Sequence, residues 1–308
     1  MLQKTITGYG LAAALFCALT LSVSVWAQTY RSGQHIEPAF EGWRPNADGT
    51  FSFMFGYMNE NWEQTIDIPV GENNMLSPGQ ADRGQPTHFL PRRNRFTFEV
   101  MVPADWGDRE LVWTLNSPNG EQRRAYATLA PDYIVDSVVI ASETGSLGAG
   151  TSSPESRANI KPDIEVLGDE IRVARVGEPL ELLTRVEDDG IPRTRVKSPR
   201  SEEELRERMM DRPVRVTVDK INGLFLSWNK YRGEGNVSFD PPLPKPWEDT
   251  RVAANSPWSE LWVPPPMPED GIYRVHATFD EPGVYVLWAR ADDGGLYNDS
   301  YITVRVTE

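Results

Sequence analysis

The feature that most constrains the fold is an alternation of large apolar residues with small or polar ones. Between residues 50 and 57, Phe51, Phe53, Phe55 and Tyr57 occupy every second position. A period of two places all four aromatic side chains on one face of an extended strand. A row of this kind packs against a second sheet, so the segment predicts the core of a β-sandwich.

The same alternation continues to about residue 140. The residues between the alternating segments are turn formers, and Ser117-Pro118-Asn119-Gly120 predicts a hairpin that joins residues 111–115 to residues 124–129. One sandwich is therefore expected over roughly residues 30–140. Its other predicted strands are Ile66–Val70, Phe96–Val102 and Leu111–Leu115.

Strand-like segments resume near residue 164 and continue to the end of the chain. They are short, are separated by Gly, Pro and Asp turns, and show almost no helical period, which predicts a second sandwich. The small-residue stretch before them, residues 142–157, predicts a Gly/Ser-rich linker or an extended loop on the first module. The predicted strands are 164–166, 171–173, 180–186, 214–218, 224–228, 273–279, 284–291 and 302–306.

Two insertions interrupt this second set of strands. Ser201 followed by Glu204 forms a capping box, which predicts a short solvated helix. Residues 240–270 carry nine prolines, too many for a central strand, so a long extended surface loop is expected there.

The first residues predict export. Lys4 precedes an apolar stretch, Leu11–Val25, and Val25-Trp26-Ala27 places small residues where a signal peptidase reads them. The stretch is roughly 15 residues long, against the 20 or so that span a bilayer. We expect residues 1–27 to be a signal peptide that is cleaved before Gln28, with no transmembrane segment left after cleavage. A lipid anchor at Cys17 is disfavoured, because Phe16 stands where Gly, Ala or Ser is required.

Cysteine content and charge narrow the possible functions further. Cleavage removes Cys17, the only cysteine, so the mature chain has no disulfide and no thiol nucleophile. It keeps 30 of the 31 basic residues against all 45 acidic ones, a net charge of −15. This excess of negative charge argues against nucleic acid and anionic membranes as partners.

Several ordered motifs in the second half resemble a PKD-type immunoglobulin-like domain. They include Val176-Gly177-Glu178-Pro179-Leu180, Val186-Glu187-Asp188-Asp189-Gly190, Pro282-Gly283-Val284-Tyr285 and Ala289-Arg290-Ala291-Asp292-Asp293-Gly294. The resemblance covers nearly all of residues 159–308. It implies an extracellular spacer, adhesion or binding module without chemistry of its own.

The first half, over roughly residues 40–130, resembles a module of uncharacterised secreted bacterial proteins. Phe55-Gly56-Tyr57-Met58-Asn59 and the run from Asp82 to Phe89 carry this likeness. It implies a secreted β-sandwich. Together the two halves predict an all-β chain of two tandem immunoglobulin-like sandwiches, residues 28–141 and 158–308, with a short helical insertion and a proline-rich loop.

No motif in the sequence compels a reaction. His35, His88 and His276 lie in three distant segments, without the spacing of a zinc site. The sequence has no Gly-x-Ser-x-Gly elbow, phosphate loop or dinucleotide fingerprint. We therefore predict a non-enzymatic protein. A carboxylate-based hydrolase acting in a cleft between the modules remains the enzymatic alternative.

A basic island in this acidic chain is the first candidate site. His88, Arg92, Arg93 and Arg95 lie close together in the sequence, and guanidinium groups match carboxylate or sulfate anions. The favoured alternative is that these arginines pair with the protein's own acids and hold the two modules together. On that interpretation the island contacts acids such as Glu143 or Glu155.

Two other sets of residues are weaker candidates. The acidic turns Asp188-Asp189-Gly190 and Asp292-Asp293-Gly294, with Asp299 nearby, offer oxygen ligands for calcium, although Asp-Gly is also an ordinary turn pair, which we favour. No other cofactor is implied.

Trp247, Trp258 and Trp262 in the proline-rich loop are suited to stacking on sugars or docking a protein, or else to covering a sandwich edge. The sequence thus predicts an exported, periplasmic or secreted interaction protein whose partner is a protein or a carbohydrate of the cell envelope. Calcium-dependent adhesion is a further alternative.

Overall fold

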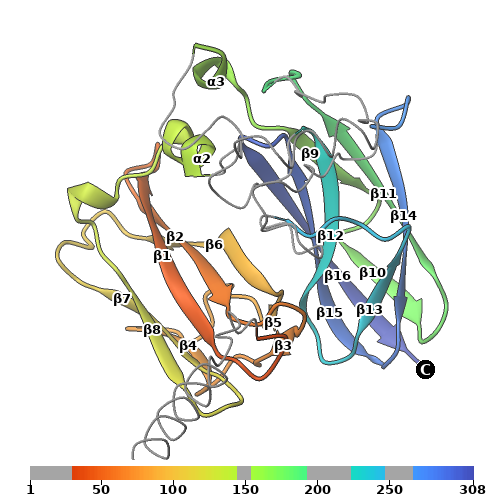
Figure 1. The fold of residues 1–308 in the computed structure, drawn as a ribbon, viewed down its shortest axis with the longest axis horizontal. Helices are drawn as coiled ribbons and strands as arrows, with labels where there is room; N and C mark the ends of the chain where they lie inside the picture. Colours follow the sequence, from red (N-terminus) through yellow and green to blue (C-terminus); the bar gives the residue numbers. More distant parts are fainter. Residues whose placement is uncertain (1–29, 144–153, 193–222, 247–265) are drawn as a thin grey trace, which may run out of the picture. The chain divides into compact units, whose positions relative to one another are not determined.

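The computed structural model describes residues 30–143, 154–192, 223–246 and 266–308, and it is almost entirely β-sheet (Figure 1). Residues Arg31–Glu308 form one compact unit. Within it the strands build two immunoglobulin-like sandwiches, which confirms the predicted fold class.

The first sandwich packs the sheet β1-β2-β6 against the sheet β4-β7-β8, with a small β3-β5 pair beside them. All the pairings are antiparallel. The strands are β1 (Ile36–Pro45), β2 (Phe51–Asn59), β3 (Ile66–Asp67), β4 (Asn74–Ser77), β5 (His88–Phe89), β6 (Arg92–Val102), β7 (Leu111–Asn116) and β8 (Gln122–Ala127).

Two local predictions for this sandwich are confirmed. The turn at Ser117–Gly120 joins β7 to β8, with Leu111 opposite Ala127 and Asn116 opposite Gln122. The aromatic row of β2 lies in the core, where Phe53, Phe55 and Tyr57 are at most 1 % exposed. The period of two therefore identified the inward face of this strand correctly.

The second sandwich packs the sheet β10-β16-β15-β12 against the sheet β13-β14-β11-β9. Strand β10 pairs with β16 in parallel, whereas the other pairings are antiparallel. The strands are β9 (Asp163–Leu167), β10 (Ile171–Arg175), β11 (Leu180–Glu187), β12 (Phe225–Arg232), β13 (Val237–Asp240), β14 (Ile272–Phe279), β15 (Gly283–Asp292) and β16 (Tyr297–Thr307).

Strand β6 departs from the predicted alternation because it contains a wide bulge. Phe55 pairs with Phe98 and Tyr57 with Asn94, so three residues of β6 face Gly56 alone. A Cβ at Gly56 would lie 2.5 Å from the carbonyl oxygen of Asn94, which explains the glycine. The bulge turns Phe96 away from the core that holds Phe98, so the prediction that both share one face was wrong.

Helices stand at both ends of the predicted linker. Helix α2 (Ser137–Glu143) follows a 3-10 turn, η1 (Pro131–Tyr133), and helix α3 (Pro154–Ala158) precedes β9. Ile140 and Ala141 of α2 are buried in a third apolar cluster, together with Met54, Phe96 and Leu296. The apolar face of α2, just before the predicted linker, thus packs between the sandwiches, while residues 144–153 lie outside the described part of the chain and the linker itself stays a prediction.

Several predicted features lie outside the described residues. These are the capped helix near residues 201–206, the strand at 214–218 and most of the proline-rich loop. Among the helices that the structure describes, none combines the length and apolar character needed to cross a bilayer.

Candidate functional site

The two sandwiches meet along a surface that we call the seam. Its first-sandwich side consists of residues 82–88 and the β6 bulge, and its second-sandwich side consists of Lys230–Arg232 of β12 and Arg290 of β15. Tyr231 and Trp288 of the second sandwich also belong to the apolar core cluster of the first. The seam is therefore continuous with a hydrophobic core.

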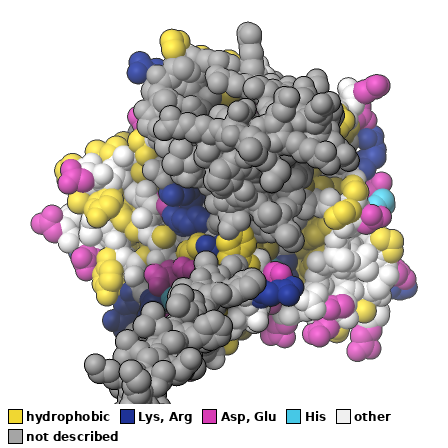
Figure 2. Space-filling view, in the orientation of Figure 1, with side chains coloured by type: hydrophobic (Ala, Val, Ile, Leu, Met, Phe, Trp, Pro, Cys, Tyr) yellow, Lys and Arg dark blue, Asp and Glu magenta, His cyan; other side chains and the backbone are white. Residues whose placement is uncertain are grey.

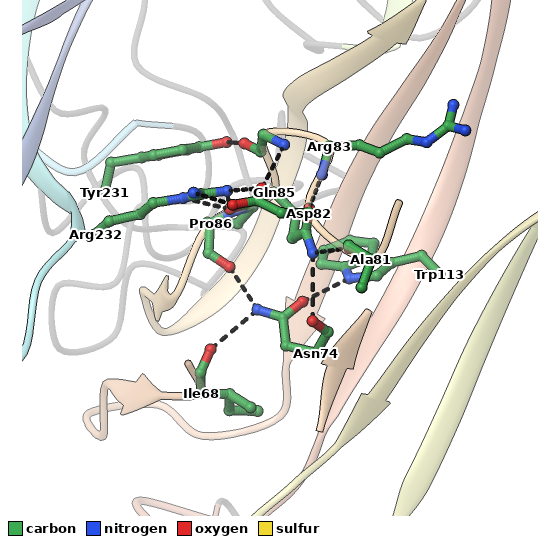
Figure 3. A network of polar contacts seen from close by, with 11 residues as sticks. Ile68, Asn74, Ala81, Asp82, Arg83, Gln85, Pro86, Trp113, Tyr231 and Arg232 are labelled. Carbon is green, nitrogen blue, oxygen red and sulfur yellow. Dashed lines mark hydrogen bonds and ion pairs between the residues drawn. The ribbon is translucent and has the colours of Figure 1, made fainter. Parts of the chain in front are cut away.

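A chain of polar contacts crosses the seam at β12 (Figure 3). Arg232 forms a two-pronged ion pair with Asp82, at 2.8 and 2.9 Å, and its Nη2 also donates to the carbonyl of Gln85 at 2.6 Å. The hydroxyl of Tyr231 donates to the carbonyl of Gly84 at 2.5 Å. Forked contacts of this kind fix orientation as well as distance.

The same chain extends into the first core. The side chain of Gln85 donates to Ala81 and Asn74, and the amide of Asn74 donates to the carbonyls of Ile68 and Pro86. The indole of Trp113 donates to Asn74 at 3.0 Å. As Figure 3 shows, Arg232 is thus linked through buried amides to the central tryptophan of the first sandwich.

A second contact joins β15 to the β6 bulge. Arg290 is fully buried, and its guanidinium donates to both oxygens of Asp299 at 2.8 Å and to the carbonyl of Phe96 at 2.7 Å. Burial alone lowers the pKa of Arg290, but the charge of Asp299 and its hydrogen bonds raise it overall, so the guanidinium stays charged.

Sequence reasoning overlooked this buried charge. Arg290 is the only charged residue in the apolar run Tyr285–Ala291, and that isolation was the available signal. Its guanidinium also lies 3.9 Å from the ring centroid of Tyr297 and 4.6 Å from that of Trp288. Arg290 therefore orients the aromatic residues beside it as well as joining the two sandwiches.

Next to Arg290 lies a cavity of about 610 Å³, which we call the seam cavity. This volume is within the range of small-molecule sites. Its walls come from β1, β6, α2, the segment before β9, and β16 with the turn that precedes it. The lining residues used below are Arg44, Phe96, Glu99, Ile140, Asn159, Lys161, Leu296, Tyr297, Asn298, Asp299 and Tyr301.

Most charged groups of the seam cavity already have partners. Arg44 donates to both oxygens of Glu99 at 2.9 Å, and Asp299 accepts from Arg290 and from the indole of Trp288. Lys161 donates to Asn298 at 3.3 Å. The cavity is therefore lined by charged groups of both signs, and most of them are already bonded to other groups of the protein.

Asn159 differs from these residues. It is 9 % exposed, and neither its amide nitrogen nor its amide oxygen has a hydrogen-bond partner. A Cβ at Gly295 would lie 2.9 Å from the nitrogen, so a glycine there leaves room for the amide. An unpaired buried amide is costly, which marks Asn159 as a residue that a ligand would stabilise.

The tyrosines of the cavity act as neutral groups. Burial raises the pKa of Tyr297, and it raises the pKa of Tyr301 well above its ordinary value. Both phenols therefore keep their protons at physiological pH and are able to donate as well as accept hydrogen bonds.

The basic island does not line the seam cavity. Arg93 and Arg95 both approach Glu41, at 2.6 and 3.8 Å, and the carboxylate of Glu41 is only 5 % exposed. Arg92 lies over the ring of Trp62 and 3.6 Å from Glu60. These partners belong to the first sandwich, as expected if the arginines pair with the protein's own acids.

His88 contacts the second sandwich through a shared partner. It lies 2.7 Å from Asp67, which is also 3.1 Å from Lys230 of β12. Burial alone raises the pKa of Asp67, but the hydrogen bond with His88 and the nearby Lys230 lower it overall. The side chains of Glu143 and Glu155 lie outside the description, so their contact with the island stays a prediction.

The acidic turns have the geometry of ordinary Asp turns. Asp188 accepts from Gly190, Asp292 from Gly294, and Asp293 from Gly295 and Leu296. Asp189 also accepts from Ile160. Within the described ranges, no group of three or more His, Cys, Asp or Glu side chains is placed to hold a metal ion.

The remaining candidates are not placed. Trp247, Trp258 and Trp262 lie outside the described residues. On the face drawn in Figure 2, acidic side chains are scattered rather than gathered into one patch. The strongest candidate site in the described structure is therefore the seam cavity, which Asp299 lines but which the basic island and the two acidic turns do not.

Comparison with known proteins assigns no family to this chain. No protein-family model matches it, and no curated protein matches it. A chimeric titin Z1Z2 functionalized with a KLER peptide from decorin is similar at 10% identity, with a TM-score of 0.24, over 90% of this chain and 100% of that chain.

Two further structures give comparable values. The D00-D0 domain of intimin is similar at 10% identity and a TM-score of 0.22, over 88% of this chain and 99% of that one. Fibronectin(III)-like modules of Clostridium thermocellum CbhA are similar at 9% identity and a TM-score of 0.20, over 89% and 94%. Similarity this low identifies no partner.

Proposed function

We propose that this protein is an exported, non-catalytic binding protein of the periplasm or cell exterior, and that its ligand occupies the seam cavity. The observation that carries the proposal is a cavity of about 610 Å³ whose walls come from both sandwiches and include an unpaired buried amide. A concave site with aromatic walls and a few polar groups is the usual form of a ligand site.

The position of the cavity supports a rigid, preformed site. Phe96 is held by the β6 bulge, and Tyr297 and Asp299 are held by Arg290, which in turn binds the bulge. Side chains fixed by their neighbours lose little conformational entropy when a ligand enters. We propose that the buried Arg290 keeps the walls of the cavity in fixed positions relative to one another.

The enzymatic alternative is a hydrolase that uses Glu99 and Asp299, the two carboxylates lining the cavity. A glycosidase pair needs one carboxylic acid to give up a proton and the other to act as base or nucleophile. Here Asp299 is held by the fork of Arg290 and also accepts from Trp288, and both oxygens of Glu99 accept from Nη2 of Arg44. Because both carboxylates already accept hydrogen bonds from basic side chains, these contacts favour binding over hydrolysis.

Export is part of the proposal and rests on the leader-like residues 1–27 together with the resemblance to secreted modules. Intact-mass analysis of protein from the cell envelope and medium tests it. The expected species begins at Gln28. An abundant species that retains Met1–Ala27 would contradict export with cleavage.

Binding is tested by immobilising the purified protein and exposing it to envelope extract. We expect retention of envelope material that is recovered with unchanged mass. A Glu99→Gln variant distinguishes the two functions, because a hydrolase that needs both carboxylates would lose product formation, whereas the pair of Arg290 with Asp299 and binding would be kept. Turnover of retained material by the unaltered protein would overturn the non-catalytic proposal, and no retention would overturn binding.

A further inference from the structure

The walls of the seam cavity combine aromatic and apolar surface with groups that both donate and accept. Phe96, Tyr297 and Leu296 give the apolar surface, and Tyr301 lies among them with 40 % of its surface exposed. An exposed tyrosine at a cavity offers a flat face for stacking and a hydroxyl for hydrogen bonding. A ligand with flat apolar faces and polar edges matches this arrangement.

The charges of the cavity argue against an ionic ligand. Arg44 is paired with Glu99, and Asp299 is paired with the buried Arg290. Lys161, the remaining cation of the lining, donates to the uncharged amide of Asn298 at an exposed position, where water screens its charge. An anion would have to compete with the two carboxylates, and a cation with the two arginines. A neutral ligand meets neither penalty.

The amide of Asn159 argues against a purely apolar ligand. Covering an unpaired donor and acceptor with hydrocarbon would leave both unpaired, which is costly. Both amide atoms are covered from water, so rotation of the side chain is the motion that would present them to the cavity. An amide then offers one donor and one acceptor side by side, which suits two neighbouring hydroxyl groups.

The edge of β6 argues against a peptide added as a strand. β6 is the outer strand of its sheet, and Phe96–Glu99 line the cavity. Its bulge, in which three residues face Gly56, interrupts the regular ladder that strand addition requires. Main-chain pairing of an extended peptide along this edge is therefore disfavoured.

We infer that the seam cavity binds a neutral sugar or a short neutral oligosaccharide, with Tyr301 stacking on a ring and Asn159 bonding its hydroxyl groups. The inference rests on the proposed binding function and names its ligand class. A sugar ring has apolar C–H faces and hydroxyl edges, and each hydroxyl donates and accepts. A neutral sugar is therefore able to stack on the aromatic wall and to bond the unpaired amide without adding a charge to the cavity.

The test uses the immobilised full protein and envelope extract in three forms: untreated, oxidised with periodate, or digested with protease. Periodate destroys vicinal diols of sugars, whereas protease destroys protein partners. We expect periodate to abolish retention and protease to leave it. We also expect a mixture of maltotriose, cellotriose and xylotriose to compete with retention, and trigalacturonic acid not to compete.

Matched variants locate the binding. Asn159→Ala and Tyr301→Ala should each weaken retention on the order of tenfold, which corresponds to about one lost good contact. Asn119→Ala, in the β7–β8 turn, and Tyr126→Ala, on β8 with 51 % exposure, change the same residue types away from the cavity and should leave retention unchanged. Circular dichroism confirms that each variant is folded.

Each outcome decides the inference. Retention that protease abolishes, or that survives periodate, would overturn the sugar and leave the proposed binding function standing. Sugar-dependent retention that is equal in the cavity variants and their controls would place the sugar site elsewhere and overturn the seam cavity. Absence of any retention would instead overturn the proposed function itself.

Discussion

The central tryptophan of each sandwich core donates its indole N–H to a polar side chain, but the two polar side chains have different roles. Trp113 of the first sandwich donates to Asn74, which also donates to two loop carbonyls. Trp228 of the second sandwich donates to Thr184, a residue within the regular strand β11. Asn74 therefore bonds loop backbone as well as its tryptophan, whereas Thr184 bonds its tryptophan alone.

The difference extends to the rest of each sandwich. The first sandwich buries five amide side chains, and their hydrogen-bond partners are mostly backbone groups of loops; these residues are Asn59, Asn61, Asn74, Gln85 and Asn94. The second sandwich has longer ladders, and its buried basic residues, Lys230 and Arg290, face the seam. The backbone N–H and C=O groups of irregular loops need side-chain hydrogen-bond partners, whereas those of a regular β-ladder bond to each other.

The largest expected effect comes from removing the buried charge of the second sandwich. Arg290→Ala leaves Asp299 as an uncompensated charge and removes a donor from the carbonyl of Phe96. We expect a loss of about 3–5 kcal/mol in the free energy of unfolding, measured by urea denaturation.

A double variant sharpens this result. Arg290→Met with Asp299→Leu removes both charges together, so it should recover most of the loss. A loss below about 1 kcal/mol in Arg290→Ala alone would show that water reaches Asp299 and that the seam is loose.

The second effect concerns the amides of the first sandwich. Asn74→Ala leaves the carbonyls of Ile68 and Pro86 and the indole of Trp113 without their partner. We expect the free energy of unfolding to fall by about 2–4 kcal/mol, measured by urea denaturation followed by tryptophan fluorescence. An effect no greater than that of the matched change below would contradict the role assigned to Asn74.

The matched change in the second sandwich is Thr184→Val. It keeps the shape of a buried side chain and removes one acceptor, that of the Trp228 indole. The expected loss is about 1 kcal/mol, because a single hydrogen bond is affected. A loss equal to that of Asn74→Ala would remove the distinction between the two sandwiches.

The smallest effect concerns the exposed edge of the seam. The hydrogen bond from Arg232 lowers the pKa of Asp82 below its ordinary value. A lowered folded pKa gives stability that is present above the unfolded pKa and is lost as pH falls through the folded pKa. Asp82→Asn should reduce the fall in unfolding free energy at acidic pH by an amount well below about 1 kcal/mol, because the ion pair is partly exposed to water.

Thermal denaturation at several acidic pH values measures this difference. Asp270→Asn is the control, because the carboxylate of Asp270 pairs with Arg274 and lies away from the seam. Each of these two changes is also combined with a second change at Arg232. We expect the stability effects to be non-additive only when the first change is at Asp82. Additivity of the two changes would show that the ion pair contributes nothing to the seam.

Local patterns in the sequence predicted most of the strands, the β7–β8 hairpin and the aromatic core row of β2, although they missed β1, β4, β5 and β13. These features depend on residues a few positions apart, where a period of two or a turn former acts directly. The alternation failed at Phe96, because the bulge in β6 changes which way a side chain faces without changing the residue pattern.

Only the tertiary structure decided the seam and its cavity. Arg290 and the carbonyl of Phe96 are 194 residues apart, and Arg232 and Asp82 are 150 apart. No periodicity links positions so distant, so the basic island and the acidic turns looked like better sites than Asn159 or Tyr301. Burial of a paired charge and an unpaired amide is a property of packed surfaces, which exist only once both sandwiches have folded against each other.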